Sequence, residues 1–200
     1  LYLRSLENKH PEPILKDEFS KDVVNRIEYD FAKFDRSKLS RVGVAIRARF
    51  FDDWIVKFTR THPSAVIVQL GAGLDTRPLR LAPLCPEATF YDLDLPDVIA
   101  LRDKLVPKAP RNYTLACSML ETAWMDELAA KHAGEEFVFV LEGVSMFFEK
   151  PIFREFFLNL AARFSGLVLV DLLNDFATKM NTRKHDTLKF MKEEVKIKMG

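Results

Sequence analysis

The fold is decided by the stretch from Val66 to Arg77, which reads Val-Ile-Val-Gln-Leu-Gly-Ala-Gly-Leu-Asp-Thr-Arg. Its first half is a short, mostly apolar and β-branched run, typical of a strand covered on both faces of a parallel sheet. Gly71 and Gly73 then let the backbone turn sharply and let a ligand approach without meeting a Cβ atom. Asp75 or Thr76 offers an N-cap for a following helix. The stretch therefore predicts a strand, a glycine loop and a helix start, whose free N–H groups suit a nucleotide or nucleoside.

Taken alone, the glycine loop has a second interpretation. Thr76 stands where the third glycine of the dinucleotide fingerprint would be, so an ordinary tight strand-to-helix turn stays open. A second predicted strand ends in Asp92 and Asp94 about 20 residues later, where nucleotide-binding folds hold an acid against ribose hydroxyls. We expect only one of these acids to face a ligand, and we predict Asp94. The alternative for Asp94 is a solvated strand end or a helix N-cap.

Strands and helices alternate along the rest of the chain. Three further strands are expected at residues 113–117, 137–141 and 167–173, and helices begin near Pro78, Pro96, Thr122 and Pro151. This alternation predicts an α/β fold with a Rossmann-like, doubly wound, mainly parallel sheet and ligands at the carboxyl ends of its strands.

Two helices are expected before the first strand. One runs from Asp17 to about Phe34, and the other runs from near Ser40 to Arg60. The second helix is predicted to bury six apolar residues, namely Val44, Ala48, Phe51, Trp54, Ile55 and Phe58. The chain is thus divided, within one globular unit, into an N-terminal helical cap (residues 1–62), an α/β core (63–174) and a charged helical segment that is a lid or the start of an acceptor site (175–200).

The composition narrows the function classes. Lys plus Arg (30) and Asp plus Glu (29) nearly cancel, so the basic footprint of a nucleic-acid binder is missing and small molecules or peptides are the expected partners. The two cysteines and four histidines lack the spacing of a disulfide framework or a metal site. No export signal and no apolar run of about 18 residues is present, so we expect a cytoplasmic protein without a membrane span. The ends at Leu1 and Gly200 suggest a fragment.

Two further charged residues are candidates for the site. Glu142 directly follows the apolar run 137–141, and open α/β sheets present functional groups at such strand ends. Arg47 could pair with a ligand carboxylate, but a solvated helix face is an open alternative for it. Ser145 lacks the downstream glycine of a nucleophile elbow, which argues against a serine hydrolase. No catalytic residue and no metal ligand is identified.

Several of these residues together resemble one known family. Leu70 to Arg77, Asp94-Leu95-Pro96 and Leu141-Glu142-Gly143-Val144 are similar to the leucine carboxyl methyltransferase family, which includes tetracenomycin-type polyketide O-methyltransferases. The resemblance runs from about Ile14 to Leu173. It implies a class I methyltransferase fold that binds S-adenosylmethionine and methylates a carboxyl or hydroxyl oxygen. Such a sheet normally has seven strands, so the last antiparallel pair is expected beyond Gly200.

The resemblance also implies roles for five residues. Arg47 would contact the methionine carboxylate of the cofactor, Gly71 and Gly73 would back the methionine and ribose, Asp94 would hold the ribose hydroxyls, and Glu142 would reach the methionine end. Adenine contacts stay open, because Ser118-Met119 stands where relatives can carry Asp-Leu. Phe148 likewise replaces a common Tyr.

The expected acceptor is a carboxylate, on a polyketide-type small molecule or a protein C-terminus. Methyl transfer from a sulfonium to an ionised carboxylate is an in-line displacement that needs positioning and desolvation but no base. Two alternatives remain at this point, an NAD(P)-dependent oxidoreductase using the same glycine loop and a non-catalytic nucleotide-binding protein.

Overall fold

The structure is a computed structural model that describes residues 1–172, so the segment predicted as a lid at 175–200 lies outside the described residues. Five parallel strands form one sheet in the order β3-β2-β1-β4-β5. The strands are β1 (Val66–Leu70), β2 (Thr89–Asp94), β3 (Asn112–Ala116), β4 (Phe137–Leu141) and β5 (Gly166–Val170). This confirms the predicted doubly wound α/β sheet. The order reverses between β1 and β4, and ligands of such sheets bind at that switch point.

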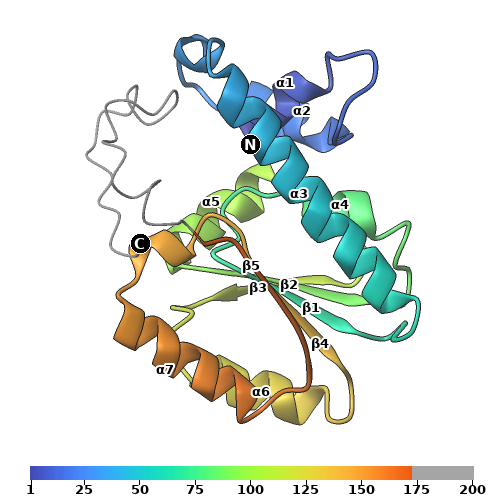
Figure 1. Ribbon diagram of the computed structural model, residues 1–200, viewed down its shortest axis with the longest axis vertical. Coiled ribbons are helices and arrows are strands. Elements are labelled where there is room, and N and C mark those ends of the chain that lie inside the picture. The colour runs from blue at the N-terminus through green and yellow to red at the C-terminus, as the bar shows by residue number, and fades with distance from the viewer. Residues whose placement is uncertain (173–200) are drawn as a thin grey trace.

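Helices cover both faces of the sheet (Figure 1). One face carries α3 (Lys38–Thr59), α4 (Arg77–Leu81) and α5 (Pro96–Leu105), and the other carries α6 (Ala123–Lys131) and α7 (Lys150–Ala161). Because strand side chains alternate, each face has its own apolar cluster. Ile67 and Val138 pack with Phe51 of α3 on one face, whereas Val68 and Phe139 pack with α6 and α7 on the other.

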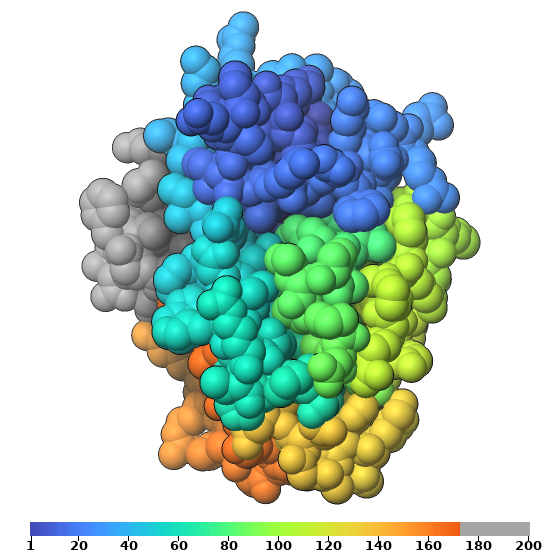
Figure 2. All heavy atoms as spheres, turned by 90° about the vertical axis from the view of Figure 1, so that its right-hand side faces the viewer, coloured from blue at the N-terminus to red at the C-terminus, as the bar shows by residue number. Residues whose placement is uncertain are grey.

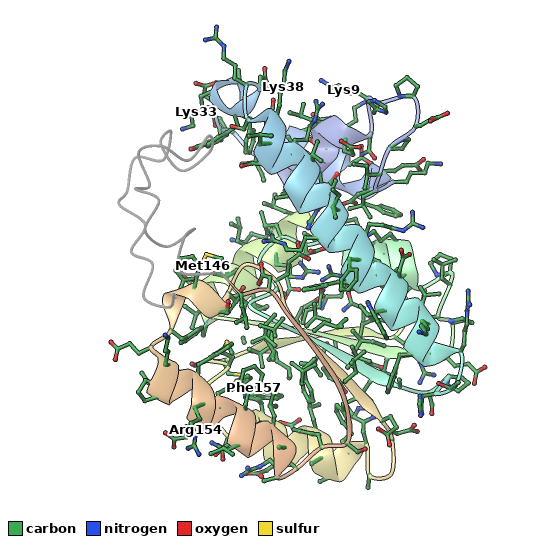
Figure 3. The ribbon with its side chains drawn as sticks, viewed as in Figure 1. Lys9, Lys33, Lys38, Met146, Arg154 and Phe157 are labelled. Atoms are coloured by element: carbon green, nitrogen blue, oxygen red, sulfur yellow. The ribbon has the colours of Figure 1, made fainter. Side chains whose placement is uncertain are left out.

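The first residues form short helical segments. These segments are α1 (Tyr2–Glu7), which the sequence did not predict, α2 (Glu18–Asn25) and the 3-10 turn η1 (Ala32–Phe34). Of these, α1 packs against both α3 and α2. In the space-filling view they form the top of the molecule, above α3 and α4 (Figure 2). The labelled Lys9 and Lys33 of this region, and Lys38 at the start of α3, lie at the end of the molecule that is away from the sheet (Figure 3).

The predicted helix from Asp17 to Phe34 is wrong beyond Asn25. The chain turns there, with the N–H of Ala32 donating to the Asp30 carboxylate at 3.2 Å, and η1 follows as a separate element. The ring of Phe31 stacks on Tyr2 of α1 with centroids 4.9 Å apart. The apparent helical spacing of the aromatic residues therefore reflects packing against α1 and not one continuous helix.

The long helix α3 forms where it was predicted and buries Ala48, Phe51 and Ile55, whereas Val44 and Phe58 are only partly buried and Trp54 is exposed. This side chain is 37% exposed, and the ammonium of Lys57 lies 4.5 Å from the centroid of its indole ring. The next residue, Ile55, is fully buried, and successive helical residues are rotated by about 100°. Trp54 therefore lies on the outer face of α3 and Ile55 on the inner face.

The sequence predicted no membrane span and no metal site, and the structure bears on these points only for residues 1–172. In that range no helix is long and apolar enough to cross a membrane, and no group of three or more His, Cys, Asp or Glu side chains is placed to hold a metal ion. Cys85 and Cys117 are both free thiols.

Candidate functional site

A cavity of about 280 Å³ lies at the switch point of the sheet. Its wall includes the glycine loop after β1 (Gly71 to Asp75) and Glu142 after β4. Arg47 of α3 and Arg4 of α1 complete it from the helical side. Four predicted residues, Arg47, Gly71, Gly73 and Glu142, are thus brought together, at the end of the sheet where doubly wound folds bind ligands.

The backbone of the glycine loop has a conformation that favours glycine. Gly71 and Gly73 have φ angles of +70° and +50°. A Cβ atom on Gly71 would lie 2.6 Å from Cγ2 of Val144, so the loop passes close to the segment after β4. The N–H of Gly71 donates to the carbonyl oxygen of Leu93 at 2.9 Å, which ties the loop to β2.

The two acids at the end of β2 contact different groups, although residues two apart in a strand share one face. Asp94 accepts the N–H of Gly73 at 2.7 Å through Oδ2, so it contacts the cavity wall through the loop. Asp92 is buried and accepts from Nη2 of Arg102 at 2.7 Å and from Nδ2 of Asn112 at 2.9 Å. Burial raises the pKa of Asp92. Asp92 is therefore a core residue, and the role of Asp94 toward a ribose stays a prediction.

Glu142 is held by a buried arginine that the sequence analysis did not single out. Arg77 is 1% exposed, and its Nη2 donates to Oε2 of Glu142 at 2.5 Å. Its Nε donates to Oδ1 of Asp52 at 2.7 Å, and its Nη1 donates to Oε1 of Gln69 at 2.6 Å. Arg77, the last residue of the stretch from Val66 to Arg77, thus joins β1, α3 and the segment after β4.

The carboxylates of the cavity wall are ionised at neutral pH. Burial opposes ionisation of Glu142, but attraction to Arg77 and, more weakly, to Arg4 and Arg47 outweighs it and lowers the pKa of Glu142. Burial likewise acts against Asp75, yet three arginines led by Arg4 hold the pKa of Asp75 well below its ordinary value. Both groups are weak bases as a result.

Arg47 contacts two acids. Its Nε donates to Oε1 of Glu142 at 3.1 Å, and its Nη1 donates to Oδ2 of Asp171 at 2.6 Å. This pairing favours the site over the solvated helix face that the sequence left open. Arg49, two residues on, forms an exposed pair with Asp53 of its own helix at 2.7 Å.

Arg4 is a further cavity residue that the sequence did not indicate. Its Nη1 lies 2.8 Å from Oδ2 of Asp75 and 4.0 Å from Oε1 of Glu142. The helix α1 that carries it is only six residues long, and Arg4 precedes Asp75 by 71 positions. No local pattern predicts a pair so far apart, so only the fold identifies Arg4.

Residues 1–161 of the chain match the sequence model of a family described as leucine carboxyl methyltransferase. The chain belongs to the leucine carboxyl methyltransferase family. This confirms the resemblance that the glycine loop, the Asp94 strand end and the Glu142 segment suggested.

Two curated relatives are longer proteins than the part of the chain that they match. The chain is 35% identical to the tetracenomycin polyketide synthesis O-methyltransferase TcmP of Streptomyces glaucescens, over 63% of the chain and 46% of that protein. It is 34% identical to the S-adenosyl-L-methionine-dependent methyltransferase dpfgK of Gibberella zeae, over 53% of the chain and 38% of that protein. The matched part therefore spans less than half the length of either relative.

A solved structure supports the fold of this leucine carboxyl methyltransferase family member. A crystal structure of a proposed methyltransferase from Thermobifida fusca YX superposes with a TM-score of 0.53 and 15% sequence identity. The match covers 86% of this chain and 66% of that one. The described sheet thus has the class I methyltransferase fold that the sequence predicted.

Proposed function

We propose that the protein is an S-adenosylmethionine-dependent O-methyltransferase. The observation that carries this proposal is the cavity at the switch point, which combines an open glycine loop with the ionised Glu142 and the guanidinium of Arg47. S-adenosylmethionine brings an activated methyl group on a sulfonium, together with an ammonium and a carboxylate. A wall with separate anionic and cationic groups is complementary to that zwitterionic end.

The same cavity is less suited to NAD. A dinucleotide places its pyrophosphate at the helix start after the glycine loop. Here Oδ1 of Asp75 accepts the N–H of Arg77, the first residue of α4, at 2.8 Å. A fixed carboxylate at that helix start repels a phosphate and already uses one of the N–H groups that would bind it.

Each predicted residue has a specific task in this proposal. Arg47 binds the methionine carboxylate, and Glu142 attracts the positively charged part of the methionine end. Gly71 and Gly73 allow close approach to the backbone, and Asp94 binds the ribose hydroxyls while it orders the loop through Gly73. Arg4 adds a second guanidinium to the same wall.

A carboxylate is the proposed methyl acceptor. The described residues that line the cavity include no His, Lys or Tyr, and the acids there, Asp75 and Glu142, have lowered pKa values. Neither acid can take the proton of a phenol effectively, whereas a carboxylate is already ionised at neutral pH. The acceptor class is therefore a small-molecule acid or a peptide with a free C-terminal carboxylate.

Transfer of a labelled methyl group tests this proposal. The chain is mixed with methyl-labelled S-adenosylmethionine and, in parallel, with aromatic acids, with peptides that have free C-termini and with phenols as matched controls. The proposal expects label on the acids, released by mild alkali, with a rate that is nearly flat from about pH 6.5 to 8.5. A base-stable product, or a rate that rises close to tenfold per pH unit, would instead identify hydroxyl methylation.

A further inference from the structure

Asp171 directly follows β5 and connects Arg47 to the segment after β4. Its Oδ2 accepts from Nη1 of Arg47 at 2.6 Å. The N–H of Gly143 donates to Oδ1 at 2.8 Å and to Oδ2 at 3.0 Å. The side chain of Asp171 is only 18% exposed. No sequence pattern indicated this residue, and the proposed function does not use it.

Asp171 and Glu142 differ in the cations that lie near their carboxylates. Glu142 is compensated by the buried Arg77, which binds it at 2.5 Å, so it does not depend on Arg47. The described residues offer Asp171 only one cation within ion-pair distance, which is Arg47. The pair of Arg47 and Asp171 is thus the contact that fixes the outer end of the Arg47 side chain.

The guanidinium of Arg47 has three nitrogen atoms that donate hydrogen bonds, and two of them are used by these acids. Nε is used by Glu142 and Nη1 by Asp171, while Nη2 donates to no acceptor among the described residues. The guanidinium lines the cavity and its side chain is 32% exposed. A long side chain at such a site loses rotamer freedom when it binds a ligand, unless neighbours already hold it.

We propose that Asp171 is a positioning residue that holds the guanidinium of Arg47 with its Nη2 group toward the carboxylate of the cofactor. This inference rests on the proposed function. Without the carboxylate of Asp171, Arg47 can rotate and bind Glu142 through two donors, and the fork needed by the ligand is lost. Asp171 therefore acts through Arg47 and does not touch the cofactor itself.

The substitution Asp171→Asn separates this role from a structural one. Oδ1 of asparagine can still accept the N–H of Gly143, and the backbone oxygen of residue 171 still accepts the hydroxyl of Ser145, at 2.5 Å in the structure. The amide nitrogen, however, cannot accept from Arg47. The matched control is Asp53→Asn, which removes the acid of the exposed Arg49 pair on the same helix α3.

The test measures calorimetric binding of S-adenosylhomocysteine to the unaltered chain, to Asp171→Asn, to Arg47→Gln and to the double variant. We expect Asp171→Asn to weaken binding about fivefold to tenfold, Asp53→Asn to have no effect, and the loss to vanish when Arg47→Gln is already present. Decarboxylated S-adenosylmethionine, which keeps the sulfonium and ammonium, should bind Asp171→Asn and the unaltered chain equally well.

Three other results would overturn the role of Asp171 or the proposed function. An equal loss in the Arg47→Gln background, or an equal loss for the decarboxylated ligand, would show that Asp171 acts on the loop and not through Arg47. Unchanged affinity in Asp171→Asn would also overturn the inference while leaving the proposed function intact. No binding of S-adenosylhomocysteine to the unaltered chain would overturn the proposed function and the inference with it.

Discussion

The two walls of the cavity are built in different ways. The glycine wall consists of Gly71 and Gly73 with Asp94 bound behind the loop. The charge wall consists of Glu142 and its arginines, with Asp171 bound behind Arg47. In the glycine wall the contact between Asp94 and Gly73 joins residues 21 positions apart. In the charge wall Arg77 and Glu142 are 65 positions apart, and Arg47 and Asp171 are 124 apart.

This difference has an energetic consequence. The glycine wall depends on backbone conformation and one carboxylate, so most changes there should affect the ligand more than the fold. The charge wall contains ion pairs withdrawn from water, and removing one partner leaves a buried charge without compensation. Substitution of the buried Arg77 should therefore reduce stability first, whereas Arg47, whose side chain is 32% exposed, should affect the ligand more than the fold.

The largest effect is expected for Arg77→Met. This change leaves Asp52 and Glu142 without their shared guanidinium and should lower the free energy of unfolding by about 3–5 kcal/mol. Urea unfolding measures it. Arg49→Met is the control, because its exposed pair with Asp53 should contribute at most about 0.5 kcal/mol. Similar losses in both variants would remove the distinction between buried and exposed pairs.

Gly71→Ala should have the next largest effect and shows where the glycine wall is itself structural. The positive φ angle and the approach of the new Cβ to Val144 should together cost roughly 2–3 kcal/mol. Gly73→Ala, which has a positive φ angle but no atom within 4 Å of its new Cβ, should cost only about 1 kcal/mol. In thermal unfolding, Val144→Ala should recover part of the loss at Gly71 and none at Gly73.

Asp94→Ala should affect binding and leave the fold largely intact. Losing charge-assisted bonds to the ribose costs on the order of 1.5–3 kcal/mol, so the affinity for S-adenosylhomocysteine should fall at least tenfold. Asp97→Ala, three residues on at an exposed position of α5, is the control and should bind normally. If Asp94→Ala binds as well as the unaltered chain, Asp94 only orders the loop.

Arg47→Lys should have the smallest effect of the four. Lysine keeps the charge but loses the planar fork, so we expect an affinity loss of about threefold to tenfold with unchanged stability. Arg49→Lys should bind the cofactor as well as the unaltered chain does. Damage from Arg49→Lys in place of Arg47→Lys would show that the wrong arginine of α3 was assigned to the site.

The two walls also differ in how far the sequence predicted them. Gly71, Gly73 and Asp94 could be found because a strand, a turn and the next strand end follow one another locally, and the same local patterns predicted the sheet. Glu142 was found from its place after an apolar strand. Arg4, Arg77 and Asp171 were not found, since a charged residue has the same local pattern whether its partner is water or an acid far along the chain. The helix prediction near Phe31 failed for the same reason, because Phe31 stacks on Tyr2 of α1, which lies far from it along the chain.

One calorimetric titration tests the central claim most directly. The chain is titrated in parallel with S-adenosylmethionine, S-adenosylhomocysteine and NAD at neutral pH. The carboxylate of Asp75 accepts the N–H of Arg77 at the helix start after the glycine loop, and the cavity offers Glu142 and Arg47 to a zwitterion. We therefore predict saturable 1:1 binding of the first two ligands and none of NAD. Saturable binding of NAD, with no heat from either adenosyl ligand, would contradict the account.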